Sequence, residues 1–282
     1  MTRSPATVPV QDETRPAVGS GESRWYLWGG LKRMWHNARA GWRELPEGAL
    51  KRWLIVLVIG YAVALGVTWL VTVLGRRWSQ PWMNAWDERW LRWMAENNFP
   101  TSYSDAIIFE SPGNLAYMIP LVVVSAWLAC LWRRPLIALT IVVSYVLARP
   151  LTWFGWWIWD RPRPSFIAEG LASPPLHSYP SGHVVLSASV YGVLAYLWVS
   201  ASRSIMERVL VIGATIVWLC LVVLARTRLG AHWPSDIIAG GVIAATWFTV
   251  LIIALRVSGA TPLQAGKRSE KVTHIDSADS VG

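Results

Sequence analysis

The sequence predicts an all-α, polytopic membrane protein with six transmembrane helices in one domain. Of its 282 residues, 54% are hydrophobic and only 15% are charged. The apolar residues gather in windows of about 20, the length that an α-helix needs to cross a hydrocarbon core. A soluble protein of this length would show shorter apolar runs and alternating strands or amphipathic helices. The windows lie at about 53–75, 115–132, 135–158, 184–201, 207–226 and 237–256.

The segments around these windows differ in composition. Residues 1–23 are rich in Pro, Ser, Thr and Gly and are predicted to be disordered. In the basic, tryptophan-rich arm 24–50, apolar residues recur at helical spacing. This pattern predicts an amphipathic helix that lies on an anionic inner leaflet or packs against the protein. The six-helix domain spans 51–258, and 259–282 is predicted to be a flexible cytoplasmic tail. The first window is too long and too far along the chain for a removable signal sequence.

The connection after the first window carries tryptophans at steps of four, four and three residues: Trp82, Trp86, Trp90 and Trp93. Tryptophan is favoured at membrane interfaces, so this stripe predicts a short interfacial helix. Its role is that of an aromatic belt or, alternatively, of a guide for a lipid tail. Cys130 and Cys220 lie inside windows and are expected to act as small apolar residues.

The basic residues predict the orientation in the membrane. They concentrate in the N-terminal arm, the turn at 133–134, the turn at 203–208 and the tail, which six spans place on one side. The positive-inside rule makes that side, and both termini, cytoplasmic. The net charge of +9 therefore reflects topology and does not indicate nucleic-acid binding. The expected location is the plasma membrane, of the bacterial inner-membrane type. The extracytoplasmic loops are 76–114, 159–183 and 227–236.

Three polar clusters lie in these extracytoplasmic loops, beside the windows. They are Arg161-Pro162-Arg163-Pro164, then Tyr179-Pro180-Ser181-Gly182-His183, and then Arg226 followed by His232 and Asp236. A phosphate ester requires groups that bind its charge, a nucleophile, and an acid that protonates the leaving oxygen. The clusters contain side chains of all three kinds, so they predict a site for a phosphate group on a lipid.

The middle cluster is suited to binding and acid catalysis. Ser181 occupies an N-cap position before a span, where free backbone N–H groups and the helix dipole bind anions. Gly182 has no side chain to keep a phosphate from the backbone. His183 is therefore predicted to lie at the phosphate as a general acid.

The third cluster is suited to nucleophilic catalysis. Pro234 opens the last span, which leaves His232 in the loop and Asp236 in the first helical turn. The carboxylate can then fix one imidazole nitrogen while the other attacks phosphorus. Arg226 and Arg163, at span ends, suit bidentate phosphate binding.

Together, the clusters resemble the signature of the type 2 phosphatidic acid phosphatase superfamily, which includes the lipid phosphate phosphatases. That signature reads Lys, six residues, Arg-Pro; then Pro-Ser-Gly-His; then Ser-Arg, five residues, His, three residues, Asp. The resemblance implies a phosphohistidine at His232, oriented by Asp236, and protonation of the leaving group by His183. It also implies that no metal or other cofactor takes part. The residues it assigns to phosphate binding are Arg163, Arg226, Ser181 and Gly182.

Two positions depart from this signature. Trp156 stands where the family has lysine, and Ala225 stands where it has serine. Arg161 and Arg228 are predicted to replace the lysine as weaker phosphate ligands. Arg149 lies seven residues before Trp156, about 10 Å along a helix, and is a poor direct replacement. In the same loop as the middle cluster, His177 is expected to face solvent and Asp160 to form a local salt bridge beside Arg161.

The predicted function is a metal-independent lipid phosphatase. It would remove the terminal phosphate from a polyprenyl diphosphate or a phosphatidate-like lipid at the outer membrane face, through a phosphohistidine. The alternatives are a lipid phosphotransferase on the same scaffold and a weakly active protein that binds or transports lipid phosphates. The sequence leaves the oligomeric state open.

Overall fold

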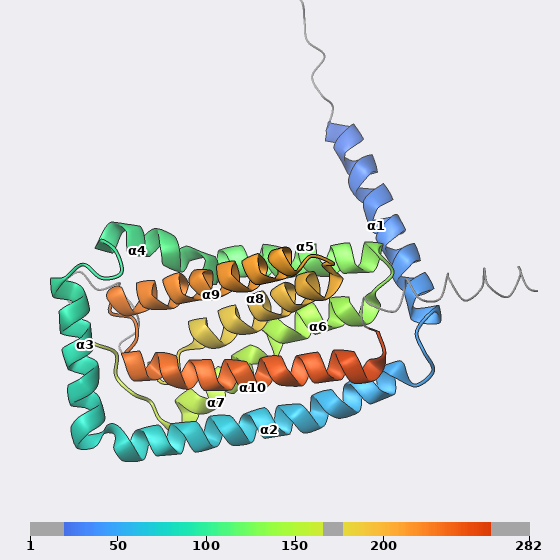
Figure 1. Ribbon diagram of the computed structural model, residues 1–282. Helices are drawn as coiled ribbons and strands as arrows, with labels where there is room; N and C mark the ends of the chain where they lie inside the picture. Colours follow the sequence, from blue (N-terminus) through green and yellow to red (C-terminus); the bar gives the residue numbers. More distant parts are fainter. Residues whose placement is uncertain (1–19, 166–176, 261–282) are drawn as a thin grey trace, which may run out of the picture.

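The computed structural model describes residues 20–165 and 177–260 of the chain. Within these residues it consists of helices joined by turns, with no strand, as Figure 1 shows. Residues 1–19 of the predicted disordered segment 1–23 lie outside the described residues, whereas its last four residues begin helix α1. The predicted tail lies outside the described residues from position 261. The α-helices are α1 (Ser20–Arg43), α2 (Ala49–Trp78), α3 (Asn84–Glu96), α4 (Tyr103–Glu110), α5 (Leu115–Leu131), α6 (Pro135–Val146), α7 (Ala148–Ile158), α8 (Gly182–Ala201), α9 (Ile205–Arg228) and α10 (Pro234–Ser258). A π-helical turn, η1 (Ser79–Met83), and a 3₁₀ turn, η2 (Ser111–Gly113), connect some of them.

Six segments of the described chain are long and apolar enough to cross a membrane, which confirms the predicted number. The second begins at Tyr103, well before the predicted start near 115, because α4, η2 and α5 form one span. The third is interrupted at Leu147, between α6 and α7. Pro150 accounts for this break, since proline has no N–H to donate to the carbonyl four residues earlier. The spans are Ala49–Trp78, Tyr103–Leu131, Pro135–Ile158, Gly182–Ala201, Ile205–Arg228 and Pro234–Ser258.

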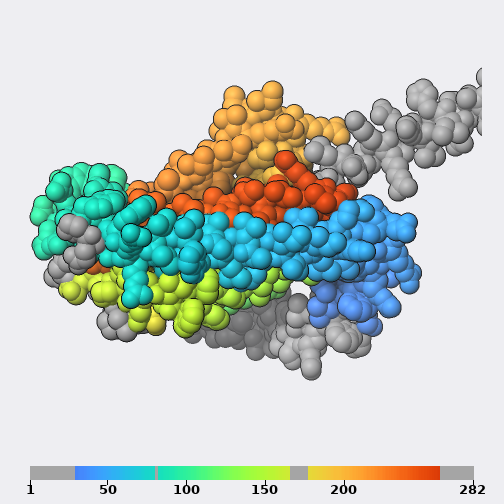
Figure 2. Space-filling view, turned by 90° about the horizontal axis from the view of Figure 1, so that it is seen from below, coloured from blue at the N-terminus to red at the C-terminus, as the bar shows by residue number. Residues whose placement is uncertain are grey.

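Helix α10 packs against both α2 and α8. Trp247 of α10 is fully buried and meets Tyr61 of α2 edge to face, with the ring centroids 5.4 Å apart. Figure 2 shows α2 along one face of the bundle with α10 beside it. The start of α10, which carries Asp236, is thereby fixed relative to α2 and α8.

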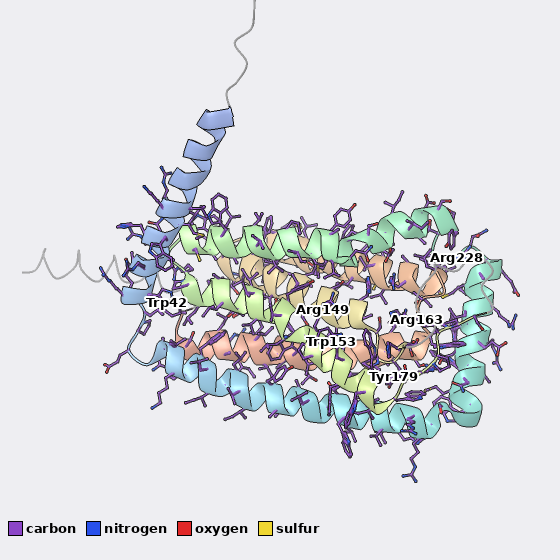
Figure 3. All side chains as sticks on the ribbon, turned by 180° about the vertical axis from the view of Figure 1, so that it is seen from behind. Trp42, Arg149, Trp153, Arg163, Tyr179 and Arg228 are labelled. Atoms are coloured by element: carbon purple, nitrogen blue, oxygen red, sulfur yellow. The ribbon has the colours of Figure 1, made fainter. Side chains whose placement is uncertain are left out.

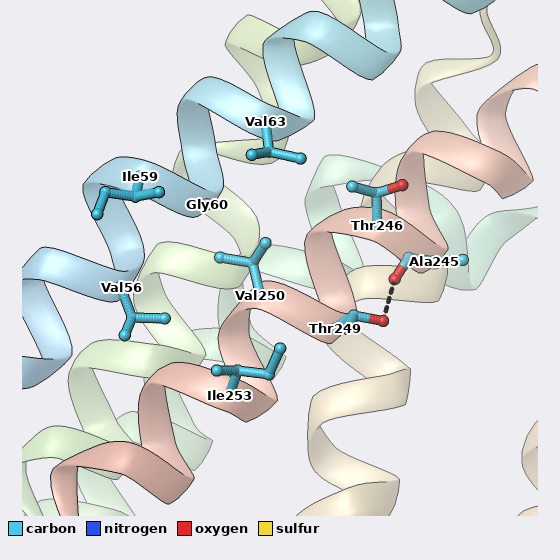
Figure 4. A pocket seen from close by; sticks show the side chains of 9 residues that line it. All are labelled: Val56, Ile59, Gly60, Val63, Ala245, Thr246, Thr249, Val250 and Ile253. Carbon is cyan, nitrogen blue, oxygen red and sulfur yellow. Dashed lines mark hydrogen bonds between the residues drawn. The ribbon is translucent and has the colours of Figure 1, made fainter.

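The contact between α2 and α10 depends on a glycine. A Cβ atom at Gly60 would lie 2.3 Å from Cγ1 of Val250, so a larger residue would separate the two helices. Beside this contact, apolar side chains such as Val56, Ile59 and Ile253 line an open groove of about 610 Å³ (Figure 4). The groove contains no charged side chain and lies in the middle of both spans, away from the polar clusters.

At one end of the bundle, called here the α3 end, helix α3 runs across the ends of the spans (Figure 1). This helix corresponds to the short helix predicted from the tryptophan stripe. Trp90 and Trp93 are exposed and their rings meet edge to face, whereas Asp87 and Leu91 of the same helix are buried against the bundle. Helix α3 therefore presents an aromatic face outward and a carboxylate inward.

At the opposite end, the α1 end, α1 projects from the bundle (Figure 1). Its C-terminal half packs on α5, where Asn37 Nδ2 donates a 2.8 Å hydrogen bond to the carbonyl of Leu131. Leu31 and Trp35 of α1 are exposed. The arm thus contacts the protein and also keeps apolar side chains on its surface, and its binding to a leaflet stays a prediction.

Candidate active site

The three polar clusters meet at the α3 end of the bundle. Ser181 caps the start of α8, and its backbone N–H donates to the carbonyl of Asp236, 3.0 Å away, at the start of α10. A Cβ atom at Gly182 would lie 3.1 Å from Cγ2 of Thr152, so glycine lets α7 approach the start of α8. Figure 3 shows Arg163 and Tyr179 at this end. The ends of α7, α8 and α10 therefore form one rigid base for the clusters.

His232 is buried in the loop before α10, with 1% of its surface exposed. Its Nδ1 lies 3.0 Å from the carbonyl oxygen of Ser178 and 3.6 Å from Oδ2 of Asp236. Because both neighbours accept hydrogen bonds, the neutral ring carries its proton on Nδ1, which leaves the lone pair on Nε2. Burial, together with the charge of Arg226, lowers the pKa of His232 to about 4, although Asp236 opposes this shift. At neutral pH the ring is therefore uncharged and nucleophilic.

Asp236 is held by donors from three segments. Its Oδ2 accepts hydrogen bonds from the Trp233 N–H, at 2.8 Å, and from the hydroxyl of Ser178. Its Oδ1 pairs with Nη1 of Arg161 at 2.7 Å. Ser178, which the sequence motifs did not single out, thus contacts His232 through its carbonyl and Asp236 through its hydroxyl. The carboxylate is fixed before any substrate binds.

Arg161 joins two buried carboxylates. Besides Asp236, it pairs with Asp87 of α3, whose Oδ2 lies 2.7 Å from Nη2 of the arginine. The rings of Trp159 and Trp233 lie 5.2 and 5.1 Å from its guanidinium carbon. Burial raises the pKa of Asp87, and hydrogen bonds from Ser235 and Arg161 counteract that rise. These contacts engage Arg161 in positioning Asp236, and they favour that role over the predicted phosphate contact.

Arg163 and Arg226 bring two positive charges together. Nη1 of Arg163 donates to the Ala231 carbonyl at 2.5 Å, and Nη1 of Arg226 pairs with Oε2 of Glu110 at 2.8 Å. Burial and the charge of Arg226 lower the pKa of Arg163 to about 10. The Nε of Arg226 and the hydroxyl of Ser181 are buried without a hydrogen-bond partner among the described residues. Because a buried, unpaired polar group is costly, neighbouring cations and orphaned donors together indicate an anion site.

His183 contacts two residues that no sequence motif predicted. Its Nε2 lies 2.9 Å from Oδ1 of Asn114 and 3.8 Å from Oε2 of Glu110. Glu110 also accepts a 3.1 Å hydrogen bond from Nδ2 of Asn114. Glu110 thus contacts Asn114 and Arg226 directly and faces His183, and the α4–α5 junction becomes part of the site.

Replacing Glu110 with glutamine is expected to lower kcat/KM for phosphate release by about 10- to 100-fold, because His183, the predicted general acid, loses its nearby negative charge. The basic limb of the pH–rate profile should move to lower pH, a change that loss of packing alone would not produce. Glu96→Gln, at the exposed end of α3, is the matched control. A Glu110→Gln enzyme with an unshifted basic limb would contradict this role.

The remaining predicted residues lie around this centre. Arg228 donates to Oδ1 of Asn98 at 3.0 Å and lies over the ring of Tyr103, so it links α9 to the connection before α4. Asp160, expected to form a local salt bridge, pairs with His177 at 2.8 Å. The backbone N–H of His177 also donates to Asp160, so two contacts join these residues.

Trp156, at the position of the family lysine, supports the turn before α8. Its indole N–H donates to the carbonyl of Pro180 at 3.1 Å, and its ring stacks on His177 with centroids 5.3 Å apart. The side chain of His177 is 49% exposed, in line with the expected solvent-facing position. The stacked rings of Trp156 and His177 thus occupy the place where the family has the charged side chain of lysine.

Comparison with known proteins agrees with this geometry. Residues 136–259 match the family model of the PAP2 superfamily. An undecaprenyl-diphosphatase from Sulfolobus acidocaldarius is 28% identical over 142 residues, which are 48% of this chain and 63% of that protein. A phosphatidylglycerophosphatase B from Haemophilus influenzae is 28% identical over 86 residues, which are 30% of this chain and 35% of that protein. The chain thus spans less than two thirds of the length of either relative.

The fold has a counterpart among solved structures. The crystal structure of a transmembrane PAP2-type phosphatidylglycerolphosphate phosphatase from Bacillus subtilis matches with a TM-score of 0.53 and 21% identity. The match covers 67% of this chain and 94% of that one. The shared fold, the family match and the converging clusters confirm the resemblance seen in the sequence. Over residues 136–259, which carry all three polar clusters, the chain is similar to the PAP2 superfamily.

Proposed function

We propose that the protein is a metal-independent lipid phosphatase that removes a terminal phosphate from a polyprenyl diphosphate or a phosphatidate-like lipid. The observation that carries the proposal is a buried, neutral His232 near the charges of Arg226 and Arg163, together with buried donors that have no partner among the described residues. The names of the two relatives, an undecaprenyl-diphosphatase and a phosphatidylglycerophosphatase, support a lipid phosphate as substrate.

The reaction has two steps. In the first, Nε2 of His232 forms a bond to phosphorus while the bond from phosphorus to the leaving oxygen breaks, and His183 gives its proton to that oxygen. In the second, water attacks the phosphohistidine, His183 takes a proton from the water, and phosphate leaves as His232 is restored. The positive imidazole of the intermediate is stabilised by Asp236, with Nδ1–H held by the Ser178 carbonyl.

The phosphoryl oxygens are bound at the start of α8 and between the two arginines. Arg163 and Arg226 neutralise the charge, and Arg226 Nε and the Ser181 hydroxyl gain the partners that they lack. The N–H groups in the first turn of α8, which begins at Gly182, complete the set. These donors are positioned before the reaction, so they favour the more highly charged transition state.

The orientation is part of the proposal. The turns at 133–134 and 202–204 lie at the α1 end, together with Lys51 and Arg52 at the start of α2. With that end cytoplasmic by the positive-inside rule, the clusters face outward. The substrate is then taken from the outer leaflet.

Phosphate release by the purified protein in detergent with excess EDTA tests the function. Wild type is expected to release phosphate from a polyprenyl diphosphate or from phosphatidic acid offered separately. If the folded protein releases phosphate from neither lipid, the proposal is overturned. In sealed right-side-out vesicles, a short-chain prenyl diphosphate added outside should be hydrolysed without permeabilisation. Hydrolysis that begins only after detergent is added would show that the site faces the vesicle interior, the opposite of the proposed orientation.

A second candidate is transfer of the phosphoryl group to an acceptor other than water. Trp156, stacked on His177, places an apolar surface where the family has lysine, and a drier site disfavours hydrolysis. Competition between water and an added acceptor alcohol, followed as phosphorylated product against free phosphate, separates the two functions.

The low pKa of His232 predicts a specific titration. Of the five histidines in the chain, one should titrate near pH 4 in NMR spectra of protein carrying ¹³C at Cε1, and that signal should vanish in His232→Gln. Below this pKa the ring is protonated and cannot attack, so the acid limb of catalysis follows it. Because the unfolded ring has a higher pKa, this group also lowers stability as the pH falls from about 6.5 towards 4. Titration of every histidine near 6.5 would contradict the prediction.

A further inference from the structure

Arg149 is a charged residue inside a membrane span that the mechanism above does not use. It lies in the first turn of α7, just after the break in the third span, and is half-buried. Its side chain makes no hydrogen bond or ion pair with any residue that the structure describes. An ionisable side chain within a span is costly to insert, and such residues commonly line substrate pathways.

The position of Arg149 relates it to the phosphate site. Thr152 and Trp156 follow it at three and seven residues, on the same side of α7. That side packs against the Pro180–His183 turn, since Thr152 borders Gly182 and Trp156 donates to the Pro180 carbonyl. Arg149 lies about 10 Å nearer the membrane centre than Trp156, as the view in Figure 3 also shows relative to Arg163. Arg149 therefore lies on the membrane side of the turn that carries His183.

A lipid substrate must pass this position. Its terminal phosphate lies at His232, between Arg163 and Arg226, while its tail extends into the membrane. The group that joins them therefore lies on the membrane side of His183, where Arg149 is found. Ser187, one turn below His183 on α8, has a buried hydroxyl without a partner among the described residues. The guanidinium of Arg149 and the hydroxyl of Ser187 thus lie between the reacting phosphate and the tail, where a hydrocarbon chain alone could not bind them.

We propose that Arg149 binds the second, tail-side phosphate of a lipid diphosphate and selects such lipids over lipid monophosphates. This inference rests on the proposed function and narrows its substrate class. When Nε2 of His232 bonds to the terminal phosphorus, the bond from that phosphorus to the bridging oxygen breaks. The leaving group is then the lipid monophosphate, on which negative charge develops in the transition state before His183 protonates the bridging oxygen. A guanidinium at this phosphate stabilises the transition state, so it raises kcat as well as affinity.

The test compares a prenyl diphosphate with the prenyl monophosphate of the same chain. Arg149→Met is expected to lower kcat/KM for the diphosphate by about 10- to 100-fold, the effect of one charged hydrogen-bonding partner. For the monophosphate the change should stay within about threefold, and Arg149→Lys should fall between wild type and Arg149→Met on the diphosphate. The matched control is Arg203→Met, which removes an exposed arginine at the α1 end and should alter neither substrate.

Thermal unfolding separates this role from a structural one. Because Arg149→Met removes an unpaired charge from the membrane interior, its Tm should equal or exceed that of wild type. A lower Tm with equal losses on both substrates would overturn the proposal, as would unchanged selectivity.

Binding of a non-hydrolysable prenyl methylenediphosphonate gives a readout that does not depend on turnover. Wild type should bind it at least about tenfold more tightly than Arg149→Met does. Equal affinities would overturn the second phosphate site. If the protein binds the diphosphonate tightly through Arg149 but releases no phosphate from any lipid, the second phosphate site is supported and the proposed hydrolysis is not.

Discussion

His232→Ala is expected to lower phosphate release by about 10⁴-fold or more, because the substitution removes the atom that bonds to phosphorus. The phosphoenzyme should disappear with it. With a lipid diphosphate labelled at the terminal phosphate, wild type quenched during turnover should retain label that is stable to base and lost in acid, whereas His232→Ala should retain none.

Two comparisons make this result specific. His183→Ala is expected to accumulate label, because a diphosphate has a good leaving group while water attack still lacks its base. His36→Ala, which changes an exposed histidine of α1, should behave as wild type does. Label that persists in His232→Ala, or turnover within tenfold of wild type, would show that another residue is the nucleophile.

Arg161→Met is expected to lower the free energy of unfolding by about 3–5 kcal/mol, because it leaves the carboxylates of Asp87 and Asp236 buried without a counter-charge. Activity should fall as well, since Asp236 loses a 2.7 Å contact on the side away from His232. Denaturation in detergent, followed by tryptophan fluorescence, measures the stability.

The chain offers a matched control on the same helix as Asp87. Arg92 pairs with Glu88 at 2.6 Å, but both side chains are about half exposed, so Arg92→Met should cost less than about 1 kcal/mol. Adding Asp87→Asn to Arg161→Met removes one of the stranded charges and should recover part of the stability. Equal stability of the two single variants would show that the buried pairs contribute no more than a surface pair.

The six spans followed from hydropathy because a helix in a membrane must be apolar over a fixed length. The three clusters could be predicted from the intervals between their residues and from their positions, since each lies within a few residues of a span end. The second span begins earlier in the structure than its hydropathy predicts. Its first part, α4, carries Asp105 and Glu110, which lower the local hydropathy, so the predicted window began near 115 and left Glu110 in a loop. The structure satisfies that carboxylate with Arg226, a residue 116 positions further along the chain.

Asp87, Ser178 and Asn114 could not be predicted either, because their partners in the site are distant in the sequence. Asp87 lies within a tryptophan stripe that gives no sign of an inward carboxylate, and Ser178 stands outside the Pro-Ser-Gly-His motif. Asn114 directly precedes the apolar helix α5, a position where asparagine is a common N-cap residue. Each contacts a cluster only after distant segments pack together, so local sequence held no signal for it. The catalytic roles assigned to the clusters stay predictions until the variants are measured.

The ion pairs of Arg161 connect a surface helix, α3, to Asp236, the carboxylate beside His232. Trp90 and Trp93 of α3 are exposed, and tryptophans keep to the headgroup region, so the depth of α3 follows the position of that region. A thicker or thinner bilayer strains the fit between spans and lipid, and Asp87 moves with α3. We therefore expect turnover to vary with the acyl-chain length of the phosphatidylcholine used for reconstitution. Bilayer thickness would then regulate the proposed activity, with no soluble effector required.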